Sequence, residues 1–272
     1  MMSLSPDSGL VDEVYPAANV EPRRDGLRPS LLILHYTGMR SARAAIEYLA
    51  RADSKVSCHY VIDEEGRITQ MVAESERAWH AGLSSWHGAT DINSLSIGIE
   101  IQNPGHEHGY PCFPAAQLRA VADLSRDICV RNGLPPEAVL AHSDVAPARK
   151  IDPGEKFDWQ LLADSGVGHW AQPARIRGRD GGDGPGASGV HVAEAQLLLR
   201  RYGYGVEPTG SIDTATEFVL KAFQRHFRPR RVDGRLDRST LETLERLVDQ
   251  LPDRGLAYCA SITNSDTERS KA

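Results

Sequence analysis

Between residues 28 and 171, short apolar runs alternate with longer stretches in which apolar residues recur at helical spacing. Two stretches of helical spacing predict helices, at residues 41–51 and 114–133. Strands are predicted by five apolar runs: 31–36, 58–63, 67–72, 95–101 and 138–142. The second and third runs flank the turn EEG and predict a hairpin. Strands interleaved with helices therefore predict an α/β domain, with a mixed central β-sheet flanked by helices.

A different pattern begins after a glycine-rich stretch, which we place at residues 172–189 and interpret as a linker. Amphipathic spacing over residues 190–251 predicts three helices, enough for a small C-terminal domain. Within it, GSIDTAT and GRLDRST repeat the pattern G-x-[I/L]-D-x-x-T, which predicts an Asp at the start of two helices. Residues 1–27 are expected to form an irregular lead-in, and residues 252–272 a flexible tail.

Composition narrows the possible functions. The chain has 40% hydrophobic and 25% charged residues, as soluble globular proteins do, and its net charge of -6 argues against binding nucleic acid. No apolar run approaches the roughly 18–20 residues of a membrane span. The N-terminal stretch has no basic start followed by an apolar run, so the sequence as written predicts a cytoplasmic protein without a signal peptide.

Candidate metal ligands lie at the ends of two predicted strands. His35 ends the run LLILHY, His142 ends the run AVLAH, and Asp152 follows in a loop that contains two prolines. Two imidazoles and one carboxylate form the ligand set of an open catalytic zinc site, with one position left for water. The chain has no H-E-x-x-H signature, so an unrelated set of surface and core residues remains an alternative at this point.

Two further charged residues are candidates for catalysis. Strand alternation in SIGIEI places Glu100 on the same face as Gly98, which leaves room for a ligand beside the carboxylate. Glu100 is either a general base or a salt-bridged structural acid. Lys150 lies two residues before Asp152 and so shares its face in an extended loop. Its cation either stabilises an oxyanion or pairs with a nearby acid, Asp144 or Glu155.

Four segments together resemble a known family: LLILHYTGM, SCHYVIDEEGRITQMV, ERAWHAGLSSWHGATDINSLSIGIEI and AHSDVAPARKIDPGEKFDW. They are similar to the zinc-dependent N-acetylmuramoyl-L-alanine amidases of the type 2 amidase family, especially its AmiD-like and AmpD-like members. The family shares its fold with peptidoglycan recognition proteins and phage T7-type lysozyme. The resemblance implies that His35, His142 and Asp152 bind Zn²⁺, that Glu100 is the general base, and that Lys150 stabilises the transition state.

The implied reaction is hydrolysis of the amide between N-acetylmuramic acid and L-alanine, in peptidoglycan or in muropeptides. Arg77, Trp79 and His80 are expected to contact a carboxylate, a sugar face and a polar group of this substrate. His59 either approaches the site or belongs to the core. A recognition protein of the same fold that binds peptidoglycan without cutting it remains the alternative, although such proteins lack part of the metal set.

The C-terminal segment resembles a bacterial peptidoglycan-binding domain of three helices. Such a domain would tether the enzyme to its polymeric substrate and raise its effective concentration there. It also favours the periplasm or cell envelope, in conflict with the missing signal peptide, so both compartments remain open. We expect a monomer.

Overall fold

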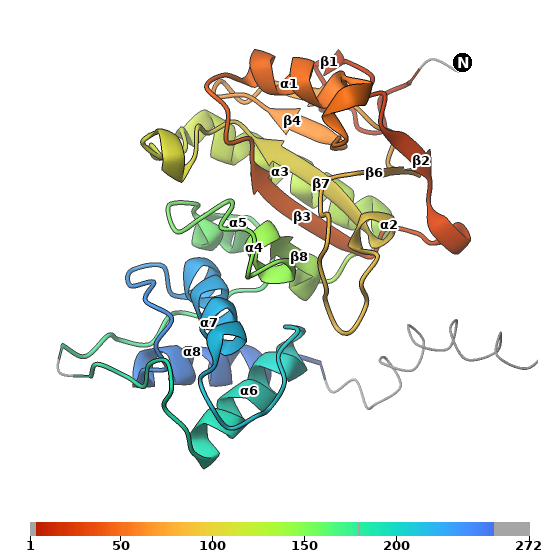
Figure 1. The fold of residues 1–272 in the computed structure, drawn as a ribbon. Coiled ribbons are helices and arrows are strands. Elements are labelled where there is room, and N and C mark those ends of the chain that lie inside the picture. The colour runs from red at the N-terminus through yellow and green to blue at the C-terminus, as the bar shows by residue number, and fades with distance from the viewer. Residues whose placement is uncertain (1–3, 179, 253–272) are drawn as a thin grey trace, which may run out of the picture.

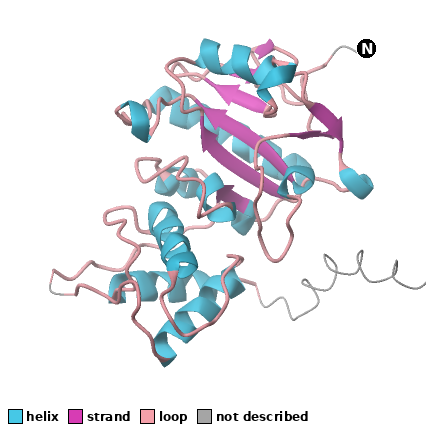
Figure 2. Cartoon of the chain, in the orientation of Figure 1, coloured by secondary structure: helices cyan, strands magenta, loops and turns pink. Residues whose placement is uncertain are grey.

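A computed structural model describes residues 4–178 and 180–252 of the chain. It has a part built around a β-sheet and a helical part below it, formed by the last helices of the chain (Figure 1). Named strands occur only before residue 142, and the helical part consists of helices and loops (Figure 2). The predicted α/β architecture with a C-terminal three-helix domain is therefore confirmed.

The central sheet contains six strands in the order β1-β5-β4-β7-β3-β8. Their bounds are Glu13–Val14 (β1), Leu31–Tyr36 (β3), Tyr60–Ile62 (β4), Ile68–Gln70 (β5), Ser96–Ile101 (β7) and Val139–Ala141 (β8). Strands β4 and β5 form the predicted antiparallel hairpin. Strands β4, β7, β3 and β8 run parallel to one another, so the sheet is mixed.

Helices cover both faces of this sheet. The helices of this part are Ala42–Ala50 (α1), Ile92–Leu95 (α2), Ala115–Asn132 (α3), His142–Val145 (α4) and Trp159–Asp164 (α5). Helices α3 and α5 pack behind the sheet on the apolar side chains of β3 and β7, and α1 covers the opposite face beside β4. Helix α3 ends at Gly133, whose φ of 65° is in the left-handed region, where the sequence predicted its end.

The described part of the expected irregular lead-in, residues 4–27, contains two short strands that the sequence did not predict. Strand β1 extends the sheet by pairing with β5, and strand β2 (Val20–Pro22) pairs with β6 (Glu76–Ala78) in a separate two-stranded sheet. The guanidinium of Arg23, directly after β2, is buried and donates to the carbonyl oxygens of Glu74 and Ser96. Residues 13–23 are therefore part of the fold.

The C-terminal domain contains the three predicted helices, α6 (Val190–Tyr202), α7 (Thr214–Phe227) and α8 (Arg238–Asp249). Asp213 and Asp237 cap α7 and α8 by accepting hydrogen bonds from the backbone of Thr216 and Thr240, so the repeat has the predicted meaning. Residues 253–272 of the predicted tail lie outside the described residues. Across the described part of the chain, no helix is long and apolar enough to cross a membrane.

The C-terminal domain is docked on the sheet-containing part and not held by a free tether. Buried apolar residues from both parts form one continuous core, in which Trp86 meets Tyr204 with ring centroids 5.0 Å apart. Gly203 allows this approach, because a Cβ there would lie 2.4 Å from the indole. The glycine-rich stretch is also fixed to the helices, since the side chain of Arg235 donates to the carbonyl oxygens of Gly181 and Gly182.

Candidate metal and catalytic site

The sheet places His35 and Glu100 side by side. His35 lies near the carboxyl end of β3 and pairs in register with Glu100 of β7. Partners in a parallel ladder point to the same face, so the imidazole and the carboxylate face one space in front of the sheet. This is the end of the sheet at which open α/β proteins place ligands.

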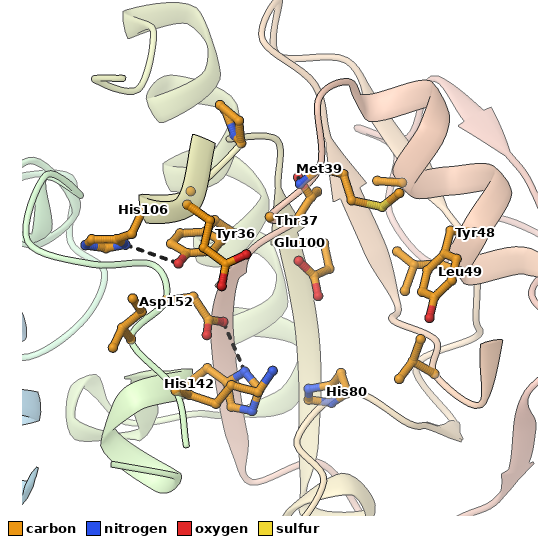
Figure 3. Close-up of a pocket in the computed structure, with 18 of the residues that line it drawn as sticks. Tyr36, Thr37, Met39, Tyr48, Leu49, His80, Glu100, His106, His142 and Asp152 are labelled. Carbon is orange, nitrogen blue, oxygen red and sulfur yellow. Dashed lines mark hydrogen bonds and ion pairs between the residues drawn. The ribbon is translucent and has the colours of Figure 1, made fainter. Parts of the chain in front are cut away.

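His142 and Asp152 complete the cluster from the next segment of chain. His142 is the first residue of α4, directly after β8, so it lies one residue beyond the strand that was predicted to end with it. Asp152 comes from the loop that follows, and Figure 3 shows its carboxylate directed at the ring of His142. The structure thus brings together the three residues that the sequence selected as ligands.

Three donor atoms converge on one point. His35 Nδ1 and His142 Nδ1 are 2.8 Å apart, and Asp152 Oδ2 lies 3.2 Å and 3.0 Å from them, respectively. Bonds of about 2.0–2.1 Å in a tetrahedral site would separate such donors by about 3.4 Å. The cluster therefore needs to open by only a few tenths of an ångström to surround an ion of this size.

Hydrogen bonding shows that the ligand nitrogen of His142 presents a lone pair and not a proton. His142 Nε2 lies 3.2 Å from the carbonyl oxygen of Ala81, which can only accept, so its proton is on Nε2 and Nδ1 is an acceptor. Asp152 contributes a second acceptor at the same point. Buried acceptors that face one another repel unless a cation lies between them, so this donor set fits a divalent metal.

The pKa values of the cluster agree with this fit. Burial, together with neighbouring His142, lowers the pKa of His35 to about 4, so its ring is neutral at pH 7. Burial alone would raise the pKa of Asp152, but the two imidazoles hold it far below its ordinary range. The neutral ring of His35 and the ionised carboxylate of Asp152 are thus in the forms that bind metals.

Glu100 is not a salt-bridged structural acid. Its Oε2 atom is buried without a hydrogen-bond partner, and Figure 3 shows its carboxylate directed toward the space beside the metal donors. Burial and the adjacent Asp152 raise the pKa of Glu100 well above its ordinary value, while Lys150 opposes the shift. A carboxylate that binds protons more tightly than usual is suited to general-base work.

Lys150 lines the same cavity as Glu100 and Asp152. The two acids that the sequence offered as its partners are engaged elsewhere. Asp144 binds His226 and Tyr204, and Glu155 binds His106. This arrangement leaves the ammonium group of Lys150 available to the cavity.

The cavity in front of the donors has a volume of about 510 Å³. One wall was not predicted from the sequence: Tyr36, whose hydroxyl lies 3.1 Å from His106 Nδ1, and the loop that carries His106 (Figure 3). The ring of His106 stacks on Tyr110, and the hydroxyl of Tyr110 donates to the carbonyl of Pro153 beside Asp152. The wall thus supports the loop that carries the third donor, a contact that residue spacing alone does not reveal.

Asp144, which lies between His142 and Asp152 in the sequence, connects this site to the C-terminal domain. Its buried carboxylate accepts from the backbone of Ala141, from the hydroxyl of Tyr204 at 2.7 Å, and from His226 Nδ1 at 2.6 Å. Tyr204 and His226 belong to the C-terminal domain, so the turn that begins with His142 is held partly by that domain.

The three expected substrate-binding residues have different surroundings. The indole of Trp79 lines the cavity, and its role as a sugar contact stays a prediction. The guanidinium of Arg77 forms ion pairs with Glu21 and Asp91 of this chain, and its expected contact with a substrate carboxylate stays a prediction. His80 lines the cavity with its ring nitrogens beside His35 and Ser96, and its expected contact with a polar group of the substrate stays a prediction.

Comparison with known proteins places the chain in a family. Residues 25–155 match the family model described as N-acetylmuramoyl-L-alanine amidase, and residues 188–244 match a putative peptidoglycan binding domain. The chain is 38% identical over 237 residues to the N-acetylmuramoyl-L-alanine amidase AmiD of Escherichia coli, covering 82% of this chain and 83% of that protein. The 1,6-anhydro-N-acetylmuramyl-L-alanine amidase AmpD of Salmonella typhimurium is 31% identical over 173 residues, which cover 57% of this chain and 90% of AmpD.

Solved structures agree. AmiD from E. coli, in complex with the substrate anhydro-N-acetylmuramic acid-L-Ala-D-gamma-Glu-L-Lys, superposes with a TM-score of 0.70 at 36% identity, covering 84% of this chain and 92% of that one. AMPDH3 from Pseudomonas aeruginosa gives a TM-score of 0.69 at 28% identity, covering 93% of this chain and 100% of that one. The chain belongs to the N-acetylmuramoyl-L-alanine amidase family.

Proposed function

We propose that this protein is a zinc-dependent amidase that hydrolyses the bond between N-acetylmuramic acid and L-alanine in muropeptides or peptidoglycan. The observation that carries the proposal is the convergence of His35 Nδ1, His142 Nδ1 and Asp152 Oδ2 beside an unpaired Glu100. The AmiD structure was solved with a muropeptide substrate, which supports the same class of substrate here. We also propose that the C-terminal domain binds the wall polymer.

Each residue of the site has a role in this reaction. When bound, zinc lowers the pKa of a water to about 7 and polarises a carbonyl group. Glu100 accepts the proton of the attacking water and passes it to the leaving amine of L-alanine. Lys150 stabilises the negative charge that develops on the carbonyl oxygen. Trp79 offers an apolar surface to the sugar.

Digestion of a defined muropeptide tests the proposal. The zinc-loaded protein should release the free stem peptide and the sugar acid from an anhydromuramyl tripeptide, and mass spectrometry should show cleavage at the lactyl–alanine amide. Removal of zinc with a chelator should abolish release, and added zinc should restore it. Binding of cell wall without release of peptide would instead support the recognition protein, and cleavage between two amino acids would make the protein a peptidase.

A conservative substitution tests the general base separately. Glu100→Gln keeps the shape of the side chain but cannot accept the proton, so we expect kcat to fall about 10²- to 10⁴-fold while zinc content is unchanged. Glu107→Gln is the matched control, because Glu107 is an exposed acid at the rim of the same cavity. A Glu100→Gln variant with near-normal kcat would remove Glu100 from the mechanism.

A further inference from the structure

A chain of hydrogen bonds begins at the first metal donor and runs away from the cavity. His35 Nε2 lies 2.9 Å from His80 Nδ1, and His80 Nε2 lies 3.2 Å from Ser96 Oγ. Ser96 Oγ in turn lies 2.6 Å from the carbonyl oxygen of Ile92. All three side chains are buried, so water does not replace any of these contacts.

The last contact fixes the direction of every proton in the chain. The carbonyl of Ile92 has no proton, and two oxygens 2.6 Å apart repel unless a hydrogen lies between them, so Ser96 donates its hydroxyl proton to Ile92. Ser96 has then only lone pairs for His80, whose proton must be on Nε2. His80 Nδ1 is therefore an acceptor, and His35 must carry its proton on Nε2.

We propose that His80 and Ser96 are positioning residues that hold His35 in its Nε2–H tautomer and so keep Nδ1 free to bind the metal. The proposal rests on the proposed metal-dependent function. It assigns to His80 a part in metal binding without direct contact to the metal or the substrate. In most metal sites a carboxylate, carbonyl or water accepts a hydrogen bond from the other ring nitrogen of a histidine ligand. Here a neutral histidine accepts that hydrogen bond, and it in turn donates a hydrogen bond to a serine.

The surrounding backbone is shaped to seat His80. Gly98 of strand β7 lies against the ring, and a Cβ at that position would lie 2.6 Å from Cγ and Nδ1 of the imidazole. The room beside Glu100 that the sequence reserved for a ligand is thus occupied by this ring. Asn93 Oδ1 accepts from the backbone of His80 and of Ala81, which fixes the segment from behind.

One short segment therefore orients both histidine donors. His80 Nδ1 accepts a hydrogen bond from Nε2 of His35, and the carbonyl oxygen of Ala81 accepts a hydrogen bond from Nε2 of His142. The rings of His35 and His80 are nearly perpendicular, with an interplanar angle of 89° and centroids 5.0 Å apart. The His80 ring is thus placed for a contact with the back of His35, and not as a further ligand.

The first test removes the acceptor at the end of the chain. In Ser96→Ala, His80 loses the reason to carry its proton on Nε2 and can donate from Nδ1, which drives the proton of His35 onto the ligand nitrogen. We expect zinc to bind the full-length variant about 10- to 100-fold more weakly, measured by competition with a chromogenic chelator. Ser125→Ala is the matched control, because Ser125 is a buried serine in α3 whose hydroxyl has no partner, and it should leave zinc affinity unchanged.

A pair of substitutions at position 80 separates tautomer control from packing. His80→Asn places a carbonyl oxygen where Nδ1 was and keeps an acceptor for His35, whereas His80→Leu keeps bulk without an acceptor. We expect the asparagine variant to retain most of the zinc affinity and the leucine variant to lose it. Equal losses in the two variants would overturn the proposal.

The wild-type protein gives a test that does not depend on any variant folding. Nitrogen-15 correlation spectra distinguish the two histidine tautomers, and we expect Nε2–H for His80 in the zinc-loaded chain and for His35 after zinc is removed by a chelator. An Nδ1–H signal from either ring would overturn the proposal. Both readouts are independent of substrate, so a protein that binds zinc as expected but cleaves no muropeptide would contradict the proposed function alone.

Discussion

His59, for which the sequence allowed either a place near the site or a place in the core, lies in the core. Its ring is fully buried, its Nδ1 accepts from the backbone of Gly98 at 3.0 Å, and its Nε2 lies 3.1 Å from the carbonyl of Glu76. Burial and the nearby guanidinium of Arg23 lower its pKa to about 3. It is a core residue, and its neutral form is part of the folded state.

This shift predicts loss of stability in acid. Below about pH 6.5 the unfolded chain takes up a proton on His59, whereas the folded chain does so only near pH 3, so the free energy of unfolding falls as the pH drops through that window. The slope is about 1.4 kcal/mol per pH unit for this one group. Urea unfolding of the metal-free protein between pH 7 and pH 4 should show a shallower decline for His59→Asn, and equal slopes would contradict the assignment.

Single residues were predicted well where strand alternation alone decides which way a side chain points. Alternation in β7 placed Glu100 on the functional face, and the ends of β3 and β8 located both histidine donors. The contacts that Arg77 and His80 make within the chain were not predictable in this way. Their partners, Glu21 and Ser96, are distant in sequence, and no local pattern of residues shows that two polar groups will satisfy each other.

At the scale of elements, the N-terminal segment is the clearest difference between sequence and structure. Strands β1 and β2 contain two and three residues, too few for apolar alternation to be visible. Arg23, the residue directly after β2, holds this segment to the rest of the fold. Its guanidinium donates to four backbone carbonyls, including those of Asn93 and Ser94 in helix α2.

Removal of this guanidinium should therefore loosen the sheet. We expect Arg23→Ala to lower the free energy of unfolding by about 3 kcal/mol or more, because several buried carbonyls lose their donors at once. Arg28→Ala, at an exposed position five residues later, should change it by less than about 0.5 kcal/mol. Chemical denaturation at fixed zinc concentration measures both, and similar values for the two variants would show that the buried arginine is dispensable.

At the scale of the whole molecule, the helices of the C-terminal domain were predictable and its docking was not. Amphipathic spacing reveals that a helix has an apolar face, but not which surface covers it. In this chain Trp86 and Val145 of the sheet-containing part enter the same core as Tyr202 and Phe227. The sequence therefore indicated two domains joined by a linker, where the structure has two parts that share one interior.

A buried hydrogen bond across this interface should couple the two parts. Tyr204→Phe removes the hydroxyl that donates to the fully buried Asp144, so we expect a loss of about 1.5–3 kcal/mol in the free energy of unfolding. Tyr202→Phe, which removes a hydroxyl beside the partly exposed His169, should cost less than about 1.5 kcal/mol. Calorimetry should show one unfolding transition in the wild type, and two well-separated transitions would mean that the parts fold independently.

The shared interior also determines how this enzyme meets a polymer. If a long flexible linker joined the catalytic part to a polymer-binding domain, the catalytic part could reach every bond within the length of that linker. If the C-terminal domain binds the wall polymer as proposed, the core that the two parts share fixes the distance between the bound strand and the cavity. We would then expect the spacing of stem peptides along the strand, and not the length of a linker, to decide which of them reaches the cavity.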